Sequence, residues 1–272
     1  MSGYFLKRNN VHVQGNPGAK ETLVFCHGYG SEQSAWRFVT PAFQERYRMV
    51  LYDLTGCGAS DLAAFDPRRY RQGSAYAADL ILLCDTLKLR KVHLITHSVS
   101  GMIGSLAALQ RPDLVESLVF IGASPHYINE DGYTGGFSAE AVKELIATME
   151  SNYLAWAQGF SPFAMNQPEN PELGLEFTRS LASMRPDVSV EIARFIFFSD
   201  FRAEIARLRL PVTILQAQHD IVVPEAVGHY LHENIPNSDL RWLTTTGHFP
   251  HMGKPEEVIE AVRLHLERVT KK

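Results

Sequence analysis

The sequence has little of several features that would place it in other protein classes. Only three of its 272 residues are cysteines, and they lack metal-ligand spacing, which indicates reduced thiols rather than a disulfide framework. No apolar run reaches the ~18–20 residues that a transmembrane helix needs, and the start, MSGYFLKRNN, lacks the apolar core of a signal peptide. The net charge of -4 gives no basic field to attract nucleic acid or an anionic membrane. We therefore expect a cytoplasmic protein that has neither of these as a partner.

Motifs for bound metals and nucleotides are also missing. The 11 histidines show no H-E-x-x-H pair and no spacing that joins them to cysteines, so we expect no metal. The glycine-rich stretch after Asp53 lacks both the Gly-Lys-Ser/Thr of a Walker A loop and the G-x-G-x-x-G of a dinucleotide site. Asp53 itself is expected to hold its own turn. The sequence predicts no cofactor.

Short apolar strands alternate with helical segments along most of the chain. Five nearly continuous apolar runs are typical of strands buried on both faces: Leu23–Cys26, Met49–Tyr52, Val92–Ile95, Leu118–Ile121 and Val212–Leu215. Leu240–Leu243 is also predicted to form a strand. Helix-like segments are Tyr76–Leu87, Gly101–Leu109, Val223–Leu231 and a last helix that opens with Pro255. This alternation predicts an α/β fold with a doubly wound, mostly parallel sheet and right-handed crossovers.

One long segment breaks this alternation. Residues 127–201 contain no convincing strand, and their helix-like pieces begin with a predicted N-cap at Ser138 and are punctuated by four prolines. This segment holds 12 of the 28 aromatic residues. The rings could form only the core of a helical subdomain, or they could also line an apolar pocket over the sheet. We predict that residues 126–201 form an inserted helical lid and that residues 1–125 and 202–272 form the core.

The strongest local motif is the stretch around Ser98, where a buried strand ends and a helix of small residues begins. A nucleophile elbow needs such a turn, which exposes the serine Oγ at the carboxyl end of the sheet. Thr96 and Ser100 stand where G-x-S-x-G has its glycines, and Thr96 is the bulkier departure. The simpler alternative is that Ser98 serves only as a helix N-cap.

A second motif, His27-Gly28-Tyr29-Gly30, follows the first apolar strand. Glycines in such a loop let backbone N–H groups face a cavity. In an acyl-transfer enzyme this loop would supply the Tyr29 N–H to an oxyanion hole, and Val99, the residue after the nucleophile, would supply the second N–H. The alternative is an ordinary strand–loop turn.

Two more polar residues follow late strands. Asp220 comes after the run that starts at Val212, and His248 comes after the strand that ends at Leu243. A serine hydroxyl needs an imidazole base, and the imidazole needs a carboxylate that fixes its tautomer. The four signals together predict a catalytic triad of Ser98, His248 and Asp220 at one edge of the sheet. His251 is kept as an alternative base.

These motifs identify a resemblance to the α/β-hydrolase subfamily of the bacterial stress regulator RsbQ and the plant strigolactone and karrikin receptors. The matching stretches are His27–Trp36, His97–Ser100, Ser124–Pro125, Gly135–Phe137, Asn152–Trp156, Phe198–Arg202 and Gly247–His251. The resemblance implies the α/β-hydrolase fold, with a four-helix lid over a deep apolar pocket. It implies the same roles for Ser98, His248 and Asp220. Pocket-lining rings are implied at Tyr29, Tyr127, Trp156, Phe160 and Phe195.

The chain departs from the family pattern at two positions. Family members carry Gly where Thr96 stands and Phe where Tyr29 stands. The Tyr29 hydroxyl could hydrogen-bond a ligand oxygen at the pocket mouth, or it could simply narrow the pocket.

The resemblance implies slow hydrolysis of small apolar esters or butenolide-type lactones through an acyl-enzyme. Its alternative is a sensor in which ligand handling controls a signalling protein partner. A third hypothesis keeps the fold but cleaves C–C bonds or performs perhydrolysis. Dehalogenases and epoxide hydrolases are disfavoured because they use Asp where this chain has Ser98.

Overall fold

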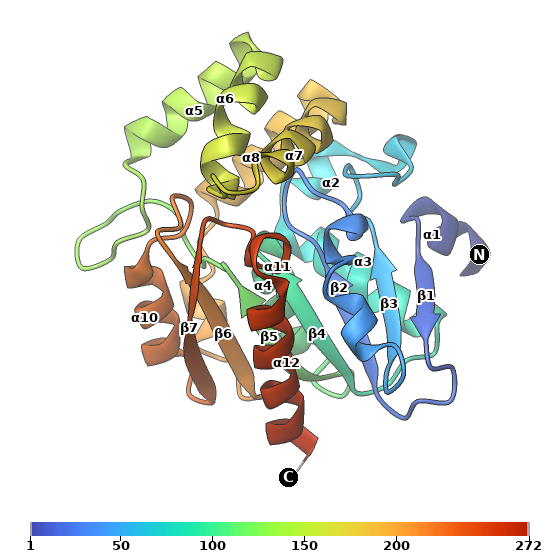
Figure 1. Cartoon of the computed structure of the whole chain (residues 1–272). Helices are drawn as coiled ribbons and strands as arrows, with labels where there is room; N and C mark the ends of the chain where they lie inside the picture. The colour runs from blue at the N-terminus through green and yellow to red at the C-terminus, as the bar shows by residue number, and fades with distance from the viewer. Residues whose placement is uncertain (1, 271–272) are drawn as a thin grey trace.

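The computed structural model describes residues 2–270, and a single sheet forms its centre (Figure 1). Within these residues the sheet has seven strands in the order β1-β3-β2-β4-β5-β6-β7. The strands are β1 (His12–Gly15), β2 (Thr22–Cys26), β3 (Arg48–Tyr52), β4 (Val92–His97), β5 (Val115–Ile121), β6 (Val212–Gln218) and β7 (Ser238–Thr246). β1 pairs antiparallel with β3, and the other neighbours pair in parallel. The predicted, mostly parallel sheet is confirmed, and its six predicted strands are β2 to β7.

The sequence does not predict β1. All four of its residues are exposed, so it has no apolar run of the kind that marks the other strands. It lies at the edge of the sheet and is held there by its pairing with β3.

Helices flank the sheet on both faces (Figure 1). Those outside the insertion are α1 (Ser2–Arg8), α2 (Pro67–Tyr70), α3 (Gly73–Thr86), α4 (Val99–Gln110), α9 (Arg202–Ile205), α10 (Glu225–Asn234), α11 (Pro250–Gly253) and α12 (Pro255–Thr270). Residues 2–270 also contain three short 3-10 helices, η1 (Gln33–Trp36), η2 (Thr40–Phe43) and η3 (Leu62–Ala64). The four helical segments predicted for this part of the chain correspond to α3, α4, α10 and α12, and α12 begins at Pro255 as expected.

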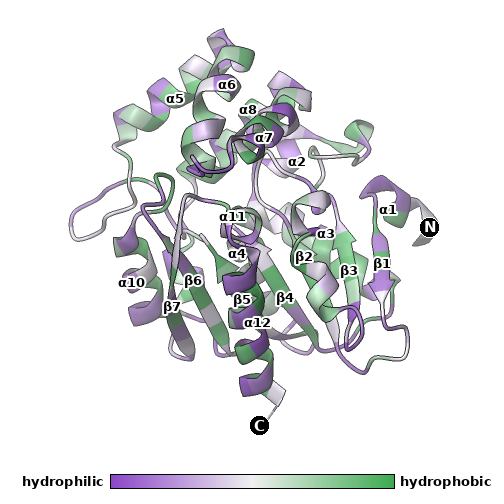
Figure 2. Cartoon of the chain, viewed as in Figure 1, coloured by the Kyte–Doolittle hydropathy of each residue, from purple (hydrophilic) through white to green (hydrophobic). Residues whose placement is uncertain are grey.

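Successive residues of the central strands pack into different layers. In β2, Val24 and Cys26 belong to a core cluster shared with α3, α4 and α10, whereas Leu23 and Phe25 belong to a second cluster shared with α12, η1 and η2. This alternation follows from the two-residue period of a strand. Figure 2 shows hydrophobic residues along the central strands and hydrophilic residues on the outer surfaces of α10 and α12. Burial on both faces explains why these strands are continuous apolar runs.

Four helices lie between β5 and α9 along the described chain: α5 (Ala139–Ser151), α6 (Tyr153–Met165), α7 (Pro171–Ser183) and α8 (Pro186–Phe198). They gather at one end of the sheet (Figure 1). The predicted cap at Ser138 is confirmed, since its Oγ accepts a hydrogen bond from the Ala141 amide at 3.0 Å. The Asn152 side chain caps α6 in the same way, through the Ala155 amide. The division of the chain at 125/126 and 201/202 stays a prediction.

Candidate active site

Ser98 stands at a strained turn between β4 and α4. Its φ of 55° and ψ of -127° lie in a region that residues with a Cβ rarely adopt. The turn is held because the Ser98 amide donates to the Ile121 carbonyl at 2.9 Å and the Ser100 hydroxyl donates to the His27 carbonyl at 2.5 Å. The Ser98 side chain makes no capping hydrogen bond to α4. The Ser98 hydroxyl therefore does not cap α4, which counts against the alternative that Ser98 serves only as a helix N-cap.

The structure brings Ser98, His248 and Asp220 into one hydrogen-bonded row. His248 Nε2 lies 2.9 Å from Ser98 Oγ, and His248 Nδ1 lies 2.7 Å from Asp220 Oδ2. The other carboxylate oxygen of Asp220 accepts hydrogen bonds from the amides of Val222 and Val223, at 2.8 and 3.1 Å. With its proton on Nδ1, the imidazole presents a lone pair at Nε2 to the serine hydroxyl. All three side chains are buried.

The backbone of His248 is fixed from two sides. Its amide donates to the Ala164 carbonyl of α6 at 2.8 Å, and its carbonyl accepts a hydrogen bond from His97 Nε2 at 2.7 Å. The preceding Gly247 has a φ of 83°, and a Cβ on it would lie 2.1 Å from the Met165 carbonyl oxygen. Only glycine fits this close approach. The loop after β7 is thus tied both to the core and to an inserted helix.

The loop that carries Tyr29 runs against Ser98. A Cβ on Gly28 would lie 2.5 Å from His97 Nδ1 and 3.1 Å from Ser98 Cβ, so the neighbouring Tyr29 backbone is close to the serine. Val99 opens α4, whose first amides have no acceptor within the helix and carry its positive dipole end. Tyr29 therefore follows a residue that packs against Ser98, and Val99 directly follows Ser98 in the chain; an oxyanion hole formed by their amides stays a prediction.

A small apolar cavity lies in front of Ser98 and His248. It leaves about 30 Å³ of space for the centre of a water-sized molecule, so it is narrower than the deep pocket that the resemblance implies. Its walls are Tyr29, Ser98, Tyr127, Trp156, Phe160, Phe177, Ile196, Phe197, Val222, His248 and Phe249. Four of the five predicted rings are present: Tyr29, Tyr127, Trp156 and Phe160. The helical segment 127–201 therefore supplies cavity walls as well as its own core.

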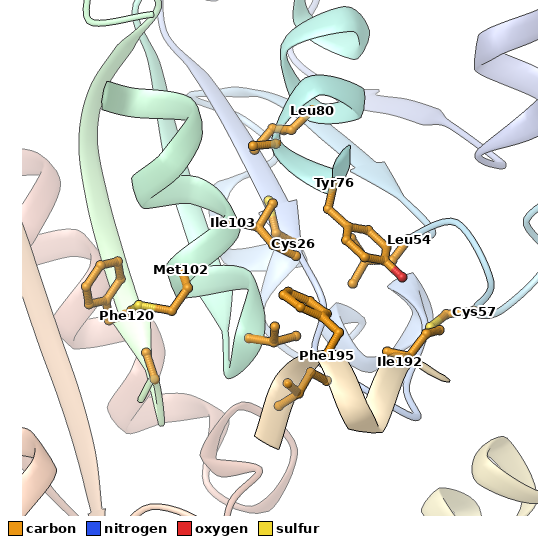
Figure 3. Packing of buried hydrophobic residues seen from close by; sticks show 14 of the residues in the cluster. Cys26, Leu54, Cys57, Tyr76, Leu80, Met102, Ile103, Phe120, Ile192 and Phe195 are labelled. Carbon is orange, nitrogen blue, oxygen red and sulfur yellow. The ribbon is translucent and has the colours of Figure 1, made fainter. Parts of the chain in front are cut away.

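The prediction for Phe195 is wrong. Its ring stacks on Tyr76 with centroids 5.6 Å apart, within the core beneath α8 (Figure 3), and it is not among the residues that line the cavity. The next two residues of the helix, Ile196 and Phe197, line the cavity instead. Consecutive residues of a helix point about 100° apart, so an error of one position exchanges a core side chain for a cavity side chain.

Sequence reasoning also missed three cavity residues besides Ile196 and Phe197, which are Phe177, Val222 and Phe249. Two signals could have found some of them: Phe249 directly follows His248, and Phe177 belongs to the aromatic-rich segment 127–201. Trp156 and Phe160, one helical turn apart, stack with centroids 5.2 Å apart and form one flat wall. The rings of Phe177 and Phe249, with centroids 4.4 Å apart, form a second wall of the cavity.

The two tyrosine hydroxyls of the cavity differ in their partners. The Tyr29 hydroxyl lies 2.5 Å from Ser189 Oγ of α8, so it joins the loop after β2 to that helix. The Tyr127 hydroxyl is buried beside Ser98 and makes no hydrogen bond of good geometry. Burial raises the pKa of both phenols well above the ordinary value, and both therefore stay neutral and can donate a hydrogen bond.

The other histidines near the site have structural partners. His251 packs between Trp36 and His97 with its ring tilted against both, at centroid distances of 4.5 Å, and neither of its nitrogens has a hydrogen-bond partner. Burial lowers the pKa of His251 to about 3. The Ser98 hydroxyl donates its hydrogen bond to His248 and not to His251, which removes the support for His251 as the base. His27 donates through Nδ1 to the Gly28 carbonyl and accepts at Nε2 from the Leu54 amide.

Asp53 binds backbone amides rather than the cavity. Its carboxylate accepts from Gln33 and Ala59, at 2.9 and 3.0 Å, which confirms that it holds its own turn. Across residues 2–270 no group of three or more His, Cys, Asp or Glu side chains is arranged to hold a metal ion. In the same part of the chain no helix is both long and apolar enough to span a bilayer.

Comparison with known proteins agrees with this geometry. The family model described as alpha/beta hydrolase fold matches residues 21–255. The chain belongs to that family. It is 38% identical to the strigolactone esterase RMS3 of Pisum sativum, over 95% of this chain and 97% of the relative. It is 36% identical to the karrikin insensitive 2 receptor IA of Petunia hybrida, over 91% of this chain and 90% of the relative. These matches confirm the predicted subfamily.

A solved structure has the same architecture. The hydrolase olei00960 of Oleispira antarctica superposes with a TM-score of 0.94 at 32% identity, covering 100% of this chain and 98% of that one. A match over the whole chain includes the inserted helices as well as the sheet. The predicted α/β-hydrolase fold is confirmed.

Proposed function

We propose that this hydrolase cleaves small apolar esters or butenolide-type lactones through an acyl-enzyme on Ser98. The observation that carries the proposal is the buried row of Asp220, His248 and Ser98, which ends in an apolar cavity. An ester or lactone carbonyl is the electrophile that suits a serine activated by imidazole. The esterase name of the pea relative supports the same class of bond.

The proposed reaction has two halves. Ser98 Oγ attacks the carbonyl carbon while His248 Nε2 takes the hydroxyl proton, and Asp220 holds the imidazole and stabilises its charged form. The Tyr29 and Val99 amides bind the oxyanion. As the tetrahedral intermediate collapses, His248 returns the proton to the leaving oxygen. Water then attacks the acyl-enzyme with His248 again as base. One oxyanion donor typically contributes ~10²–10³ in rate.

The residues that line the cavity favour small, flat, apolar substrates. The stacked pair of Trp156 and Phe160 offers a planar surface to an unsaturated ring, and the Tyr127 hydroxyl offers one hydrogen-bond donor beside Ser98. The space open to the centre of a water-sized molecule is only about 30 Å³, so the cavity as it stands admits only a small ligand. A substrate larger than this enters only if the inserted helices move apart, and such a step would make turnover slow.

A second candidate function is a sensor whose ligand controls a protein partner. It is favoured by the narrow cavity and by the receptor name of the petunia relative. The two candidates differ in rate. Turnover far below ~1 s⁻¹ on a butenolide probe, against a typical enzyme value of ~10 s⁻¹, would favour the sensor. The cysteines of the described chain, buried and unpaired, support a cytoplasmic location for either function.

The test is covalent labelling followed by intact-mass spectrometry. A fluorophosphonate probe should add once to the protein, on the peptide that contains Ser98, and Ser98→Ala should abolish both the adduct and the cleavage of p-nitrophenyl acetate. Ser105→Ala is the matched control, because the Ser105 hydroxyl is buried in the same helix and donates to the Gly101 carbonyl. Labelling or cleavage that survives in Ser98→Ala at the wild-type level would refute the mechanism.

A further inference from the structure

A chain of hydroxyl groups joins the loop at Tyr29 to three of the inserted helices. Tyr29 Oη lies 2.5 Å from Ser189 Oγ of α8, and Ser189 Oγ lies 2.8 Å from Tyr153 Oη of α6. Tyr153 Oη lies 2.8 Å from the carbonyl oxygen of Leu181 in α7. Ser189, Tyr153 and Leu181 are buried. These four residues lie up to 160 positions apart in the sequence.

The direction of this chain follows from counting protons. A carbonyl oxygen can only accept, so the single Tyr153 proton goes to Leu181. Tyr153 then accepts from the Ser189 hydroxyl, and Ser189 in turn accepts from the Tyr29 hydroxyl. Every proton has an acceptor, and the row ends on a backbone group. A buried row that is fully satisfied in this way is rigid, and a gap in it leaves a buried polar group without a partner.

A second contact ties the same loop to α7. The Ser180 hydroxyl donates to the Gly30 carbonyl at 2.7 Å. Gly30 has a φ of 70°, and a Cβ on it would lie 2.4 Å from Leu181 Cδ2. The backbone on the carboxyl side of Tyr29 is therefore held against α7, while the Tyr29 side chain is held by α8. Because the Tyr29 side chain and the backbone that follows it are both anchored, the backbone amide of Tyr29 is restrained as well.

We propose that the Tyr29 hydroxyl is a positioning group that couples the inserted helices to the oxyanion hole. Through Ser189 and Tyr153 it holds the Tyr29 amide in place only while α6, α7 and α8 are seated on the sheet. This inference rests on the proposed function and adds a role for the Tyr29 side chain. The hydroxyl does not touch the oxyanion; it holds in place the Tyr29 backbone amide, which does. The seating of α6, α7 and α8 on the sheet would then both enclose the substrate and complete the oxyanion hole.

The test compares two ketones of the same aryl skeleton. A trifluoromethyl ketone adds reversibly to a catalytic serine and forms a tetrahedral oxyanion, whereas the methyl ketone fills the cavity without adding. Tyr29→Phe keeps the ring and the amide but removes the hydroxyl. We expect it to weaken inhibition by the trifluoromethyl ketone about tenfold and to lower kcat by a similar factor, the scale of one displaced hydrogen bond. Binding of the methyl ketone and KM should change less than about twofold, because the cavity surface is kept.

Ser189→Ala should reproduce these effects, and the double variant should be no weaker than either single variant, because both break one row. Two control variants remove buried hydroxyls outside the row. Tyr133→Phe removes a donor to the His126 carbonyl, and Ser161→Ala removes a donor to Ala157 within α6. Both controls should leave kcat and both ketone affinities unchanged. Thermal unfolding of each variant shows whether it is folded at the assay temperature.

Two results would overturn the inference while the proposed function stands. In the first, Tyr29→Phe binds the trifluoromethyl ketone as tightly as the wild type does. In the second, it loses affinity for both ketones equally, which would make the hydroxyl a part of the cavity wall only. A different result would defeat the proposed function together with this inference: a wild-type protein that binds the trifluoromethyl ketone no more tightly than the methyl ketone.

Discussion

His97 donates a hydrogen bond through Nε2 to the carbonyl oxygen of His248, at 2.7 Å. His97 ends β4 and immediately precedes Ser98, whereas His248 lies in the loop after β7. A single contact therefore joins the backbone that carries the serine to the backbone that carries the imidazole. Burial, with smaller contributions from His251 and His248, keeps the pKa of His97 well below its usual value. His97 is therefore neutral, with its one proton on the nitrogen that makes this contact.

Replacing His97 should affect catalysis as well as stability. His97→Phe keeps a ring in the core but leaves the His248 carbonyl without this donor. We expect kcat to fall about 10- to 100-fold with little change in KM, since a small displacement of a catalytic group is costly, and the free energy of unfolding to fall by about 1–3 kcal/mol. Steady-state kinetics and urea unfolding measure the two effects.

His93→Phe is the matched control for this variant. His93 is also a buried histidine of β4, but it hydrogen-bonds Ser117, far along the strand from Ser98. We expect it to lose stability and keep its kcat. Equal losses of kcat in the two variants would show that His97 has no special link to His248.

Tyr127→Phe tests the unpartnered hydroxyl beside Ser98. The wild-type hydroxyl is buried without a hydrogen bond of good geometry, so its removal should leave the free energy of unfolding unchanged or slightly higher. If the substrate accepts a hydrogen bond there, kcat/KM for a butenolide lactone should fall about 3- to 10-fold. A variant with wild-type kcat/KM would assign the hydroxyl no role in recognition.

Thr96→Val tests why this chain carries threonine before the turn. The Thr96 hydroxyl donates to the Val119 carbonyl at 2.7 Å, between β4 and β5, and is fully buried. Removing only the hydroxyl should lower the free energy of unfolding by about 1 kcal/mol. Thr96→Gly, which restores the family's residue, should cost about 2–3 kcal/mol because packing is lost too. Both should keep kcat within about twofold, and a large gain or loss in Thr96→Gly would show that residue 96 shapes the serine turn.

Stability should fall in acid through the buried histidines. Burial lowers the pKa of His251 to about 3, with a further contribution from His248, so the unfolded chain binds this proton more readily than the folded protein does. The resulting stability is complete above about pH 6.5 and is lost as the pH falls towards about 3. The slope for one such group is about 1.4 kcal/mol per pH unit.

Urea unfolding between about pH 7 and pH 4 measures this slope. His251→Phe keeps a ring between Trp36 and His97. It should lower the slope of the free energy of unfolding against pH by the amount that corresponds to about one proton taken up on unfolding. An unchanged slope in this variant would show that His251 is protonated in the folded protein. His265 adds a second such group, since burial also lowers its pKa to about 3.

Much of the fold could be read from local pattern. The strands β2 to β6 are buried on both faces and therefore appear as apolar runs. β7 is only partly buried, and β1 is exposed and gives no such signal. The order of Ser98, Asp220 and His248 along the chain, each after a strand, placed them at one edge of the sheet, because parallel strands end on the same side. The structure brings them together as expected.

Contacts that depend on helix rotation and docking could not be read in this way. Phe195 and Phe197 are both aromatic residues of α8, but only the seated helix decides that Phe195 meets Tyr76 while Phe197 faces the cavity. The sequence shows a tyrosine at position 29 without showing what its hydroxyl meets, and Ser189 lies 160 residues away.

The sequence by itself determined the strand and helix pattern, the strained serine turn and the chain order of the polar residues, because these depend on neighbours close along the chain. Only the tertiary structure decided the width of the cavity, the partner of each tyrosine hydroxyl and which of His248 and His251 reaches Ser98. Those outcomes depend on how side chains from segments distant in the sequence pack against one another, and a local sequence pattern contains no information about that packing.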